Sequence, residues 1–319
     1  MSAILISLLV GTGLVITNSS DLRDWYLLLT YKPPQVIINL ANNDGMTAYA
    51  KQLFYVNRPK LDSKVVFETS CPSGTHQSYV IGCYHGGDNG IYLLNVVDPR
   101  LNGIVAVTAA YEMLHAGYAR LNSNQRYIID KQMWSFYQAN VKNTEIKQQM
   151  SVYAATEPGE QYDELYSVLA TEVASLPPSI ENLYKPYFTN RSKIVALYNG
   201  YQSVFYARIQ TINNDKTTLS KLKAEISSLN KHLSVTRQQL NTLKVQINNY
   251  QATGNIAAAN SLIASYNYDV NSYNVLVIDA RNFISQYNAT VVDINSNVLE
   301  EQQLVQAINA QAQVVLSTK

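Results

Sequence analysis

The sequence predicts a mainly helical α+β fold, with a small antiparallel sheet in its N-terminal part and a long antiparallel helical hairpin in its C-terminal part. Segments rich in β-branched and aromatic residues, bounded by glycine and proline, occur before about residue 100. From about residue 179 onward the chain is rich in Asn, Gln, Ser and Leu, and apolar residues recur at helical spacing. The 319 residues are enough for two domains, and the 47% of apolar residues are enough for a packed core.

The first residues predict a membrane tether. Residues 3–17 (AILISLLVGTGLVIT) carry no charge, although an upright membrane-spanning helix needs roughly 20 residues. No Lys or Arg precedes this run and no clear cleavage site follows it, which is unlike a secretory signal peptide. We therefore expect residues 1–20 to be a short signal-anchor that holds the protein on the extracytoplasmic side of a membrane. The alternative is a buried helix or strand.

Between residue 21 and about residue 122, short segments predict a mixture of helix and strand. "PPQVIINLANN" is typical of a helix opened by proline, whereas "AKQLFYV" and "KVVFETSC" favour strands. "QSYVIGCY" and "GIYLLNVV" predict a β-hairpin around the turn "HGGDNG". Three helices are then expected, over residues 107–121, 122–153 and 160–175, and Pro177-Pro178 ends the last of them.

The last third of the chain predicts a coiled-coil hairpin. Its apolar residues recur at alternating steps of three and four, which is a heptad pattern. The first seam is Leu219, Leu222, Ile226, Leu229, Leu233, Leu240, Leu243 and Ile247. The second is Tyr266, Val270, Tyr273, Val277, Ala280, Ile284, Tyr287, Val291, Ile294, Val298, Val305 and Ile308.

The stretch containing Gly254 separates the two seams, so the arms should fold back on each other, each with a length on the order of 75 Å. A continuous rod in a parallel dimer is the alternative. We expect three parts: an anchor in residues 1–20, a globular head in residues 21–190, and the hairpin in residues 191–319.

The two cysteines, Cys71 and Cys83, lie twelve residues apart. A pair on neighbouring strands suits a disulfide outside the reducing cytosol, and two buried free thiols are the alternative. Together with His76 and His85 they could also suggest zinc, but the spacing matches no standard zinc finger.

The stretch Val107–Leu121 (VTAAYEMLHAGYARL) contains a candidate metal site. Glu112 and His115 would complete the HExxH of a zinc peptidase if position 111 were histidine, but it is Tyr111. In that motif two histidines one turn apart reach one ion, and the glutamate acts as general base on the metal-bound water. A phenol, with a usual pKa near 10, is a poor substitute. The alternative is an ordinary helix that buries Ala110, Leu114, Tyr118 and Leu121.

This stretch resembles the "VTAAHEMLHAxYxRL" of bacterial membrane-anchored gluzincin-like proteins. "AKQLFYVNRP", "GCYHGGDNGIYL" and "DELYSVLATEVASLPPSIENLYKPYF" are similar to other landmarks of that family. The resemblance covers most of Asp21–Arg191 and implies a zincin-like head. The family has histidine where this chain has Tyr111, and we expect the family to have histidine also where this chain has Tyr166.

The resemblance also assigns candidate roles. It implies that His115 is a zinc ligand, that Glu112 is a vestigial general base, and that Tyr166 occupies a position that could orient substrate. "DELYS" is similar to the gluzincin N-E-x-x-[SA] and nominates Glu164 as the third ligand. Glu172 is the alternative, because on a helical wheel it lies nearer the apolar edge. With Tyr111 in place of the first ligand, zinc should bind weakly or not at all.

These residues leave three functions open. The first is a degenerate metallopeptidase-like protein of the cell envelope, without hydrolytic activity, that binds a partner or has a structural role. The second is an active zinc peptidase with an atypical Tyr111 site. The third is a coiled-coil adhesion or scaffold protein. The expected partners are a protein on the hairpin and a membrane at residues 1–20. A formal net charge of +1 gives no reason to expect nucleic acid.

Overall fold

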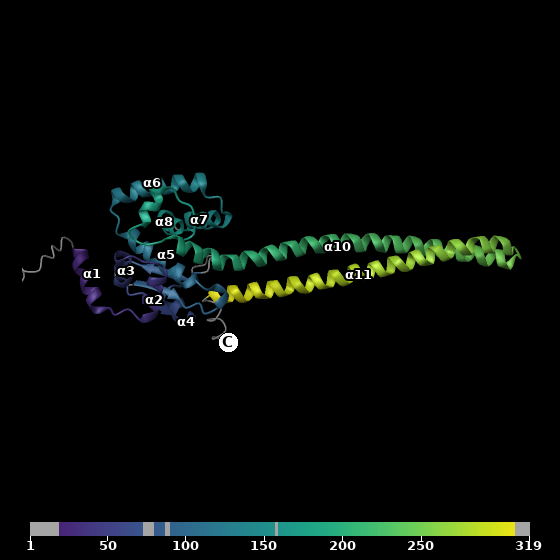
Figure 1. Cartoon of the computed structure of the whole chain (residues 1–319), viewed down its shortest axis with the longest axis horizontal. Helices are drawn as coiled ribbons and strands as arrows, with labels where there is room; N and C mark the ends of the chain where they lie inside the picture. The colour runs from purple at the N-terminus through teal and green to yellow at the C-terminus, as the bar shows by residue number, and fades with distance from the viewer. Residues whose placement is uncertain (1–18, 73–79, 87–89, 157–158, 310–319) are drawn as a thin grey trace, which may run out of the picture. The chain divides into compact units, whose positions relative to one another are not determined.

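Figure 1 shows the computed structural model, which describes residues 19–72, 80–86, 90–156 and 159–309. The protein is mainly helical (78%) with one small three-stranded sheet. The chain divides into two compact units: residues 1–204 with 304–319, and residues 205–303. Within the described ranges, no helix combines the length and the apolar character that crossing a membrane requires. The predicted anchor in residues 1–20 lies almost entirely outside the described residues.

The elements of the first unit are short. They are α1 (Ser19–Thr30), α2 (Gln35–Asn43), α3 (Ala48–Val56), β1 (Lys60–Asp62), α4 (Lys64–Ser70), β2 (Gly82–His85), β3 (Gly90–Leu94), a 3-10 turn (Pro99–Leu101), α5 (Ile104–Ala119), α6 (Ser123–Asn140), α7 (Thr144–Thr156), α8 (Gln161–Thr171) and α9 (Pro178–Tyr184). Two long helices follow, α10 (Ser192–Ala252) and α11 (Ile256–Ile308).

The sheet has the strand order β1-β3-β2 and is mixed. β2 and β3 pair antiparallel, with Cys83 opposite Tyr92, which confirms the predicted strand pair; residues 87–89 of its turn lie outside the described part. β1 pairs parallel to β3, so the expectation of a purely antiparallel sheet is wrong. The reason is that β1 reaches β3 through a crossover containing α4 and β2 rather than through a tight turn.

Two segments predicted as strands are helices. "AKQLFYV" lies in α3, where the Thr47 hydroxyl caps the N-terminus by accepting from the Ala50 amide at 3.2 Å. Its buried Ala50, Leu53 and Phe54 follow a helical period. "KVVFETS" forms α4, which buries only Phe67. Short apolar runs do not distinguish helix from strand, and here the cap and the tertiary packing decide.

The other helical predictions need smaller corrections. The segment 122–153 is two helices, because the chain is extended at Val141 between α6 and α7. α8 ends at Thr171, four residues before the expected end. α1, which was not predicted, begins at Ser19, within the last two residues of the expected anchor, and continues to Thr30.

Helix α5 is the centre of the first unit. It contacts α2, α3, α8, β2 and β3, and twelve of its sixteen residues are buried. Ala110, Leu114 and Tyr118 are among them, and so are the polar Glu112 and His115. The helix is therefore covered on nearly all sides, rather than amphipathic with one solvated face.

The second unit contains most of α10 and α11, which form the predicted antiparallel hairpin within one chain. Gly254, at the turn, has a φ of 73°, a conformation that favours glycine. The predicted seam residues of this unit are buried or half-buried, with the exception of Ile284, which is 44% exposed. Phe283 is half-buried instead, so the seam shifts by one residue there. Arg208 and Glu300 form an ion pair between the two arms.

Candidate functional site

Tyr111, on α5, bonds to the helix that carries the proposed third ligand. Its hydroxyl donates a short hydrogen bond to Oε2 of Glu164 in the first turn of α8. The phenol of Tyr153, on α7, shares a further hydrogen bond with Tyr111. Burial, reinforced by the negative charge of Glu164, raises the pKa of Tyr111 well above its usual value. Tyr111 is therefore a neutral donor.

His115 lies one turn further along α5 and has a carboxylate near each ring nitrogen. Nδ1 lies 2.8 Å from Oδ1 of Asp163, and Nε2 lies 3.8 Å from Oε1 of Glu164. Burial disfavours the charged ring, but the hydrogen bond to Asp163 and the charges of Glu164 and Asp163 outweigh it and raise the pKa of His115 to about 10. The imidazole is therefore held as a cation between two acidic side chains at neutral pH.

Glu112 is 5% exposed and lies under the sheet. A Cβ at Gly82, in β2, would be 2.8 Å from Oε1 of Glu112 and 2.4 Å from Cγ2 of Thr108. Only glycine lets the strand approach α5 this closely. Burial raises the pKa of Glu112 to about 8, against the lowering effect of His115 and with a further rise from Glu164 and Asp163. Glu112 is therefore largely protonated at pH 7.

Glu172 and Tyr166 lie elsewhere on or beside α8. Glu172 directly follows the last turn of α8. Burial raises the pKa of both Tyr111 and Tyr201, and the negative charge of Glu172 raises it further. Tyr166 is 1% exposed, and its ring packs against Tyr118, Tyr184 and Tyr187. At that exposure Tyr166 has no surface with which to contact a substrate.

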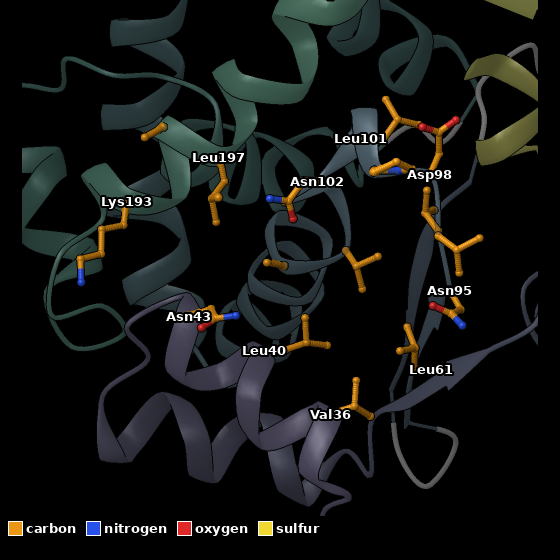
Figure 2. A pocket seen from close by; sticks show the side chains of 17 residues that line it. Val36, Leu40, Asn43, Leu61, Asn95, Asp98, Leu101, Asn102, Lys193 and Leu197 are labelled. Atoms are coloured by element: carbon orange, nitrogen blue, oxygen red, sulfur yellow. The ribbon is translucent and has the colours of Figure 1, made fainter. Parts of the chain in front are cut away.

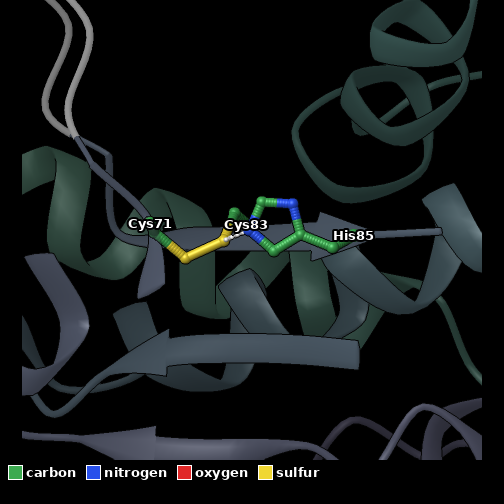
Figure 3. Close-up of side chains that lie close together, drawn as sticks. All are labelled: Cys71, Cys83 and His85. Atoms are coloured by element: carbon green, nitrogen blue, oxygen red, sulfur yellow. Dashed lines mark hydrogen bonds between the residues drawn. A yellow bond between two sulfur atoms is a disulfide. The ribbon is translucent and has the colours of Figure 1, made fainter. Parts of the chain in front are cut away.

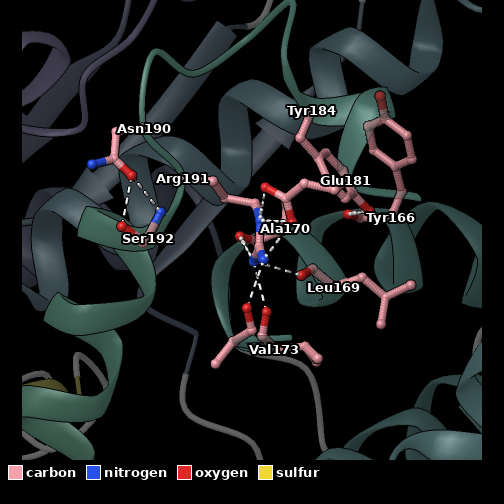
Figure 4. A network of polar contacts seen from close by, with 10 residues as sticks. Tyr166, Leu169, Ala170, Val173, Glu181, Tyr184, Asn190, Arg191 and Ser192 are labelled. Atoms are coloured by element: carbon pink, nitrogen blue, oxygen red, sulfur yellow. Dashed lines mark hydrogen bonds and ion pairs between the residues drawn. The ribbon is translucent and has the colours of Figure 1, made fainter. Parts of the chain in front are cut away.

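The C-terminal end of α8 is fixed by Arg191 (Figure 4). The guanidinium donates to the carbonyls of Leu169, Ala170, Val173 and Ala174, at distances from 2.6 to 3.3 Å. It also donates to both carboxylate oxygens of Glu181. The carbonyls of Leu169 and Ala170 are among those that a helix end leaves without intrahelical partners, and Val173 and Ala174 follow the helix, so Arg191 holds in place the end of the helix that carries Asp163 and Glu164.

The residues around His115 do not fit a three-ligand zinc site in this arrangement. A zincin site needs three protein ligands and a neutral imidazole. Here Tyr111 is a donor, and Oε2 of Glu164 is occupied by that donor. In the described part of the chain, no group of three His, Cys, Asp or Glu ligand atoms that includes His115 lies within 4.8 Å of one another.

The one group that meets this criterion in the described residues is Cys71, Cys83 and His85 (Figure 3). Cys71 and Cys83 form the predicted disulfide. His85 Nε2 lies 3.2 Å from Sγ of Cys83 and 2.9 Å from the Ser70 carbonyl. Disulfide sulfurs are not the thiolates that bind zinc, so this group acts as a covalent link between α4 and β2. His76 lies outside the described residues, and His232 is exposed on α10.

Two members of the His115 cluster were not found from the sequence. Asp163 directly precedes Glu164, and its contact with His115 could have been inferred from the rule that a ligand histidine bonds to a carboxylate through its second nitrogen. Tyr153 gave no signal, because it is one of 24 tyrosines and no motif contains it.

A cavity of about 850 Å³ lies apart from this cluster, between α2, β1 and the first turns of α5 and α10 (Figure 2). Its lining is largely apolar, and its polar members are Asn43, Asn95, Asp98, Asn102 and Lys193. No predicted site residue lines it. Comparison of the chain with models of known protein families, with curated proteins and with solved structures finds no match.

Proposed function

We propose that this protein has a zincin-like head whose metal position is taken by hydrogen bonds, and that it acts in the cell envelope as a binding or structural module without hydrolysing peptides. The observation that carries this proposal is the hydrogen bond from the Tyr111 hydroxyl to Glu164. It joins the two positions that the family resemblance assigns to the first and third metal ligands.

This bond supports the proposal because it removes two ligands at once. Tyr111 supplies a proton where a lone pair is needed, and Glu164 uses that proton to satisfy one carboxylate oxygen in a partly buried place. To bind zinc, Tyr111 would have to ionise beside Glu164, and a neighbouring negative charge opposes that ionisation. The same argument disfavours an active peptidase with Tyr111 as a ligand.

A binding role is supported by the surface of the hairpin. On α11, Tyr268, Val275, Ile278, Val292 and Leu299 are between 56% and 72% exposed. They are separate from the seam that pairs α11 with α10, and several are seven residues apart. A heptad-spaced apolar stripe outside the seam suits a further helix of a partner protein. A photo-crosslinker at Tyr268 should then capture a partner in cells, whereas one at the buried Leu222 should not.

The central test measures bound zinc and peptide cleavage in the wild-type chain and in two variants at one position. We expect no stoichiometric zinc and no EDTA-sensitive cleavage in the wild type. Tyr111→His restores an imidazole one turn from His115 and should increase zinc binding, whereas Tyr111→Phe removes the hydroxyl without adding a ligand and should not.

Stoichiometric zinc together with EDTA-sensitive cleavage in the wild type would disprove the proposal in favour of the active peptidase. If Tyr111→His folds and binds no more zinc than Tyr111→Phe, the zincin-like origin of the head is wrong. Circular dichroism of each variant establishes folding before metal is measured.

A further inference from the structure

Helix α1 has an apolar stripe on its exposed side. Leu22, Trp25, Tyr26 and Leu29 are 52%, 51%, 60% and 62% exposed. Their spacing of three, one and three places all four on one face of a helix. Single exposed apolar residues are common on protein surfaces, but four large ones on one helical face mark an interaction surface.

The stripe is held on the first unit by contacts from other residues of α1 and the segment after it. Asp24 forms an ion pair with Arg120 at 3.2 Å. The hydroxyl of Tyr31, directly after the helix, donates to the carbonyl of Pro59 at 3.0 Å. α1 also packs on α3. These contacts fix one side of α1 to the head and leave the apolar side outward.

A cationic pocket lies beside the stripe. It has a volume of about 400 Å³ and is lined by Arg23, Tyr26 and Arg58, among others. Arg58 is the one non-glycine residue with a positive φ, 44°, in the described part of the chain, and such conformations tend to occur where a side chain has a specific task. A pair of guanidinium groups suits a phosphate, since the planar fork matches two of its oxygens.

The occupant that these features fit is a lipid bilayer. Residues 3–17, which precede α1 in the sequence, carry no charge. Trp and Tyr are enriched where a protein meets the headgroup layer, because their rings are apolar with one polar atom. A helix with an apolar face and adjacent arginines lies in the plane of that layer and not across it.

We propose that the stripe formed by Leu22, Trp25, Tyr26 and Leu29 lies in the headgroup layer of a bilayer, and that Arg23 and Arg58 bind the phosphate of an anionic lipid. The head would then be fixed against the membrane surface by α1 rather than only tethered to it. This proposal does not depend on the state of the His115 cluster.

Trp25 provides a direct test, because the chain has only two tryptophans and the other, Trp134, can be replaced by Phe. The full chain with Trp134→Phe is reconstituted into vesicles of phosphatidylcholine with phosphatidylglycerol. We expect the Trp25 emission to shift to shorter wavelength, to be quenched by lipids brominated near the headgroup, and to resist acrylamide.

A matched pair of variants separates docking of α1 from simple tethering. Leu22→Ser with Leu29→Ser should abolish the quenching by brominated lipid. Tyr127→Ser with Ile128→Ser, which removes apolar side chains that are 67% and 55% exposed on α6, should leave it unchanged. If quenching persists in the α1 variant, Trp25 is near lipid only because of the residues before it, and the proposal is wrong.

The arginines are tested in the same system. Near an anionic surface each cation contributes about a fivefold preference, so Arg23→Gln with Arg58→Gln should lower the ratio of docked to undocked α1 roughly 25-fold. The protein with both arginines in place should show the same loss of docking when the vesicles contain phosphatidylcholine alone. The control Arg237→Gln, on the exposed surface of α10, should have no effect.

Two other outcomes would overturn the inference. If Trp25 is already shielded from acrylamide without lipid, and the shielding increases with protein concentration alongside a larger oligomer, the stripe is a contact between copies of this chain. If the arginine variants dock as well as their parent, the pocket does not bind phosphate.

Discussion

Two arginine–glutamate ion pairs, one in each compact unit, show how differently the units use charge. In the head, the side chain of Arg191 is 5% exposed and donates hydrogen bonds to Glu181 and to four backbone carbonyls. In the hairpin, Arg208 donates to one oxygen of Glu300, and the two side chains are 20% and 43% exposed. The stability of the head therefore depends on hydrogen bonds and ion pairs between buried polar groups. The hairpin is stabilised by its apolar seam, and its ion pair can be replaced at little cost in stability.

The largest expected difference follows from these two arginines. Arg191→Met should lower the free energy of unfolding of the head by about 3–5 kcal/mol, because it leaves helix-end carbonyls and a carboxylate without their partner. Arg208→Met should cost the hairpin at most about 1 kcal/mol, as partly exposed pairs do. Both tryptophans lie in the first unit, so urea unfolding followed by their fluorescence reports the head. Helical circular dichroism reports both units, and the part of its change that does not coincide with the fluorescence reports the hairpin. Equal losses would remove the distinction between the units.

Glycine substitutions should give a smaller difference in stability loss between the two units. Gly82→Ala places a Cβ against Thr108 and Glu112 at distances that real Cβ atoms do not show, and we expect a loss of about 1–3 kcal/mol from the overpacked interface. Gly254→Ala has open space and a positive φ, so only backbone strain acts, at about 1 kcal/mol. The same two measurements apply. A neutral Gly82→Ala would mean that β2 can move away from α5, and that the burial of Glu112 is not enforced by the strand.

The smallest expected effect is an increase, and not a loss, in the free energy of unfolding of the head. Asp44 is 0% exposed, and neither of its carboxylate oxygens has a hydrogen-bond partner among the described residues. Burial raises the pKa of Asp44 well above its usual value, so the unfolded chain loses this proton at a lower pH than the folded chain does. Asp44 therefore destabilises the head as the pH rises above the usual aspartate range, and this pH-dependent cost is absent below that range.

Asp44→Asn should accordingly stabilise the head at pH 7, on the order of 1 kcal/mol, and should have little effect near pH 3. Asp293→Asn, at an exposed position of the hairpin, should change stability by less than about 0.5 kcal/mol at either pH. If Asp44→Asn destabilises the head equally at both pH values, Asp44 has a partner that stabilises it.

The parts of the molecule that could be predicted are those whose signal is local. The hairpin seams depend on the spacing of side chains along one helix, and only Ile284 departs from it in the second unit. The β2–β3 pair and the disulfide were also foreseen, because turn residues and cysteine spacing are read within a dozen residues. The strand predictions for α3 and α4 failed because a run of seven apolar-rich residues fits either period until its neighbours are known.

The candidate site shows the same division. The sequence indicated Tyr111, Glu112 and His115 on one helix and nominated Glu164, because a motif orders them along the chain. It did not indicate that Asp163 would bond to His115, that Tyr153 would reach Tyr111, or that Arg191 would hold the end of α8. Each of these contacts joins groups from different elements.

By itself, then, the sequence determined the period of the two long helices α10 and α11, the position of the turn at Gly254 and the placing of Tyr111, Glu112 and His115 on one helix. The tertiary structure alone decided what surrounds these residues: the Tyr111 hydroxyl reaches Glu164, and His115 lies between two carboxylates. The physical reason is that helical period is set by neighbours along the chain, whereas the protonation and pairing of a buried polar group are set by whatever the fold brings within about 3 Å of it.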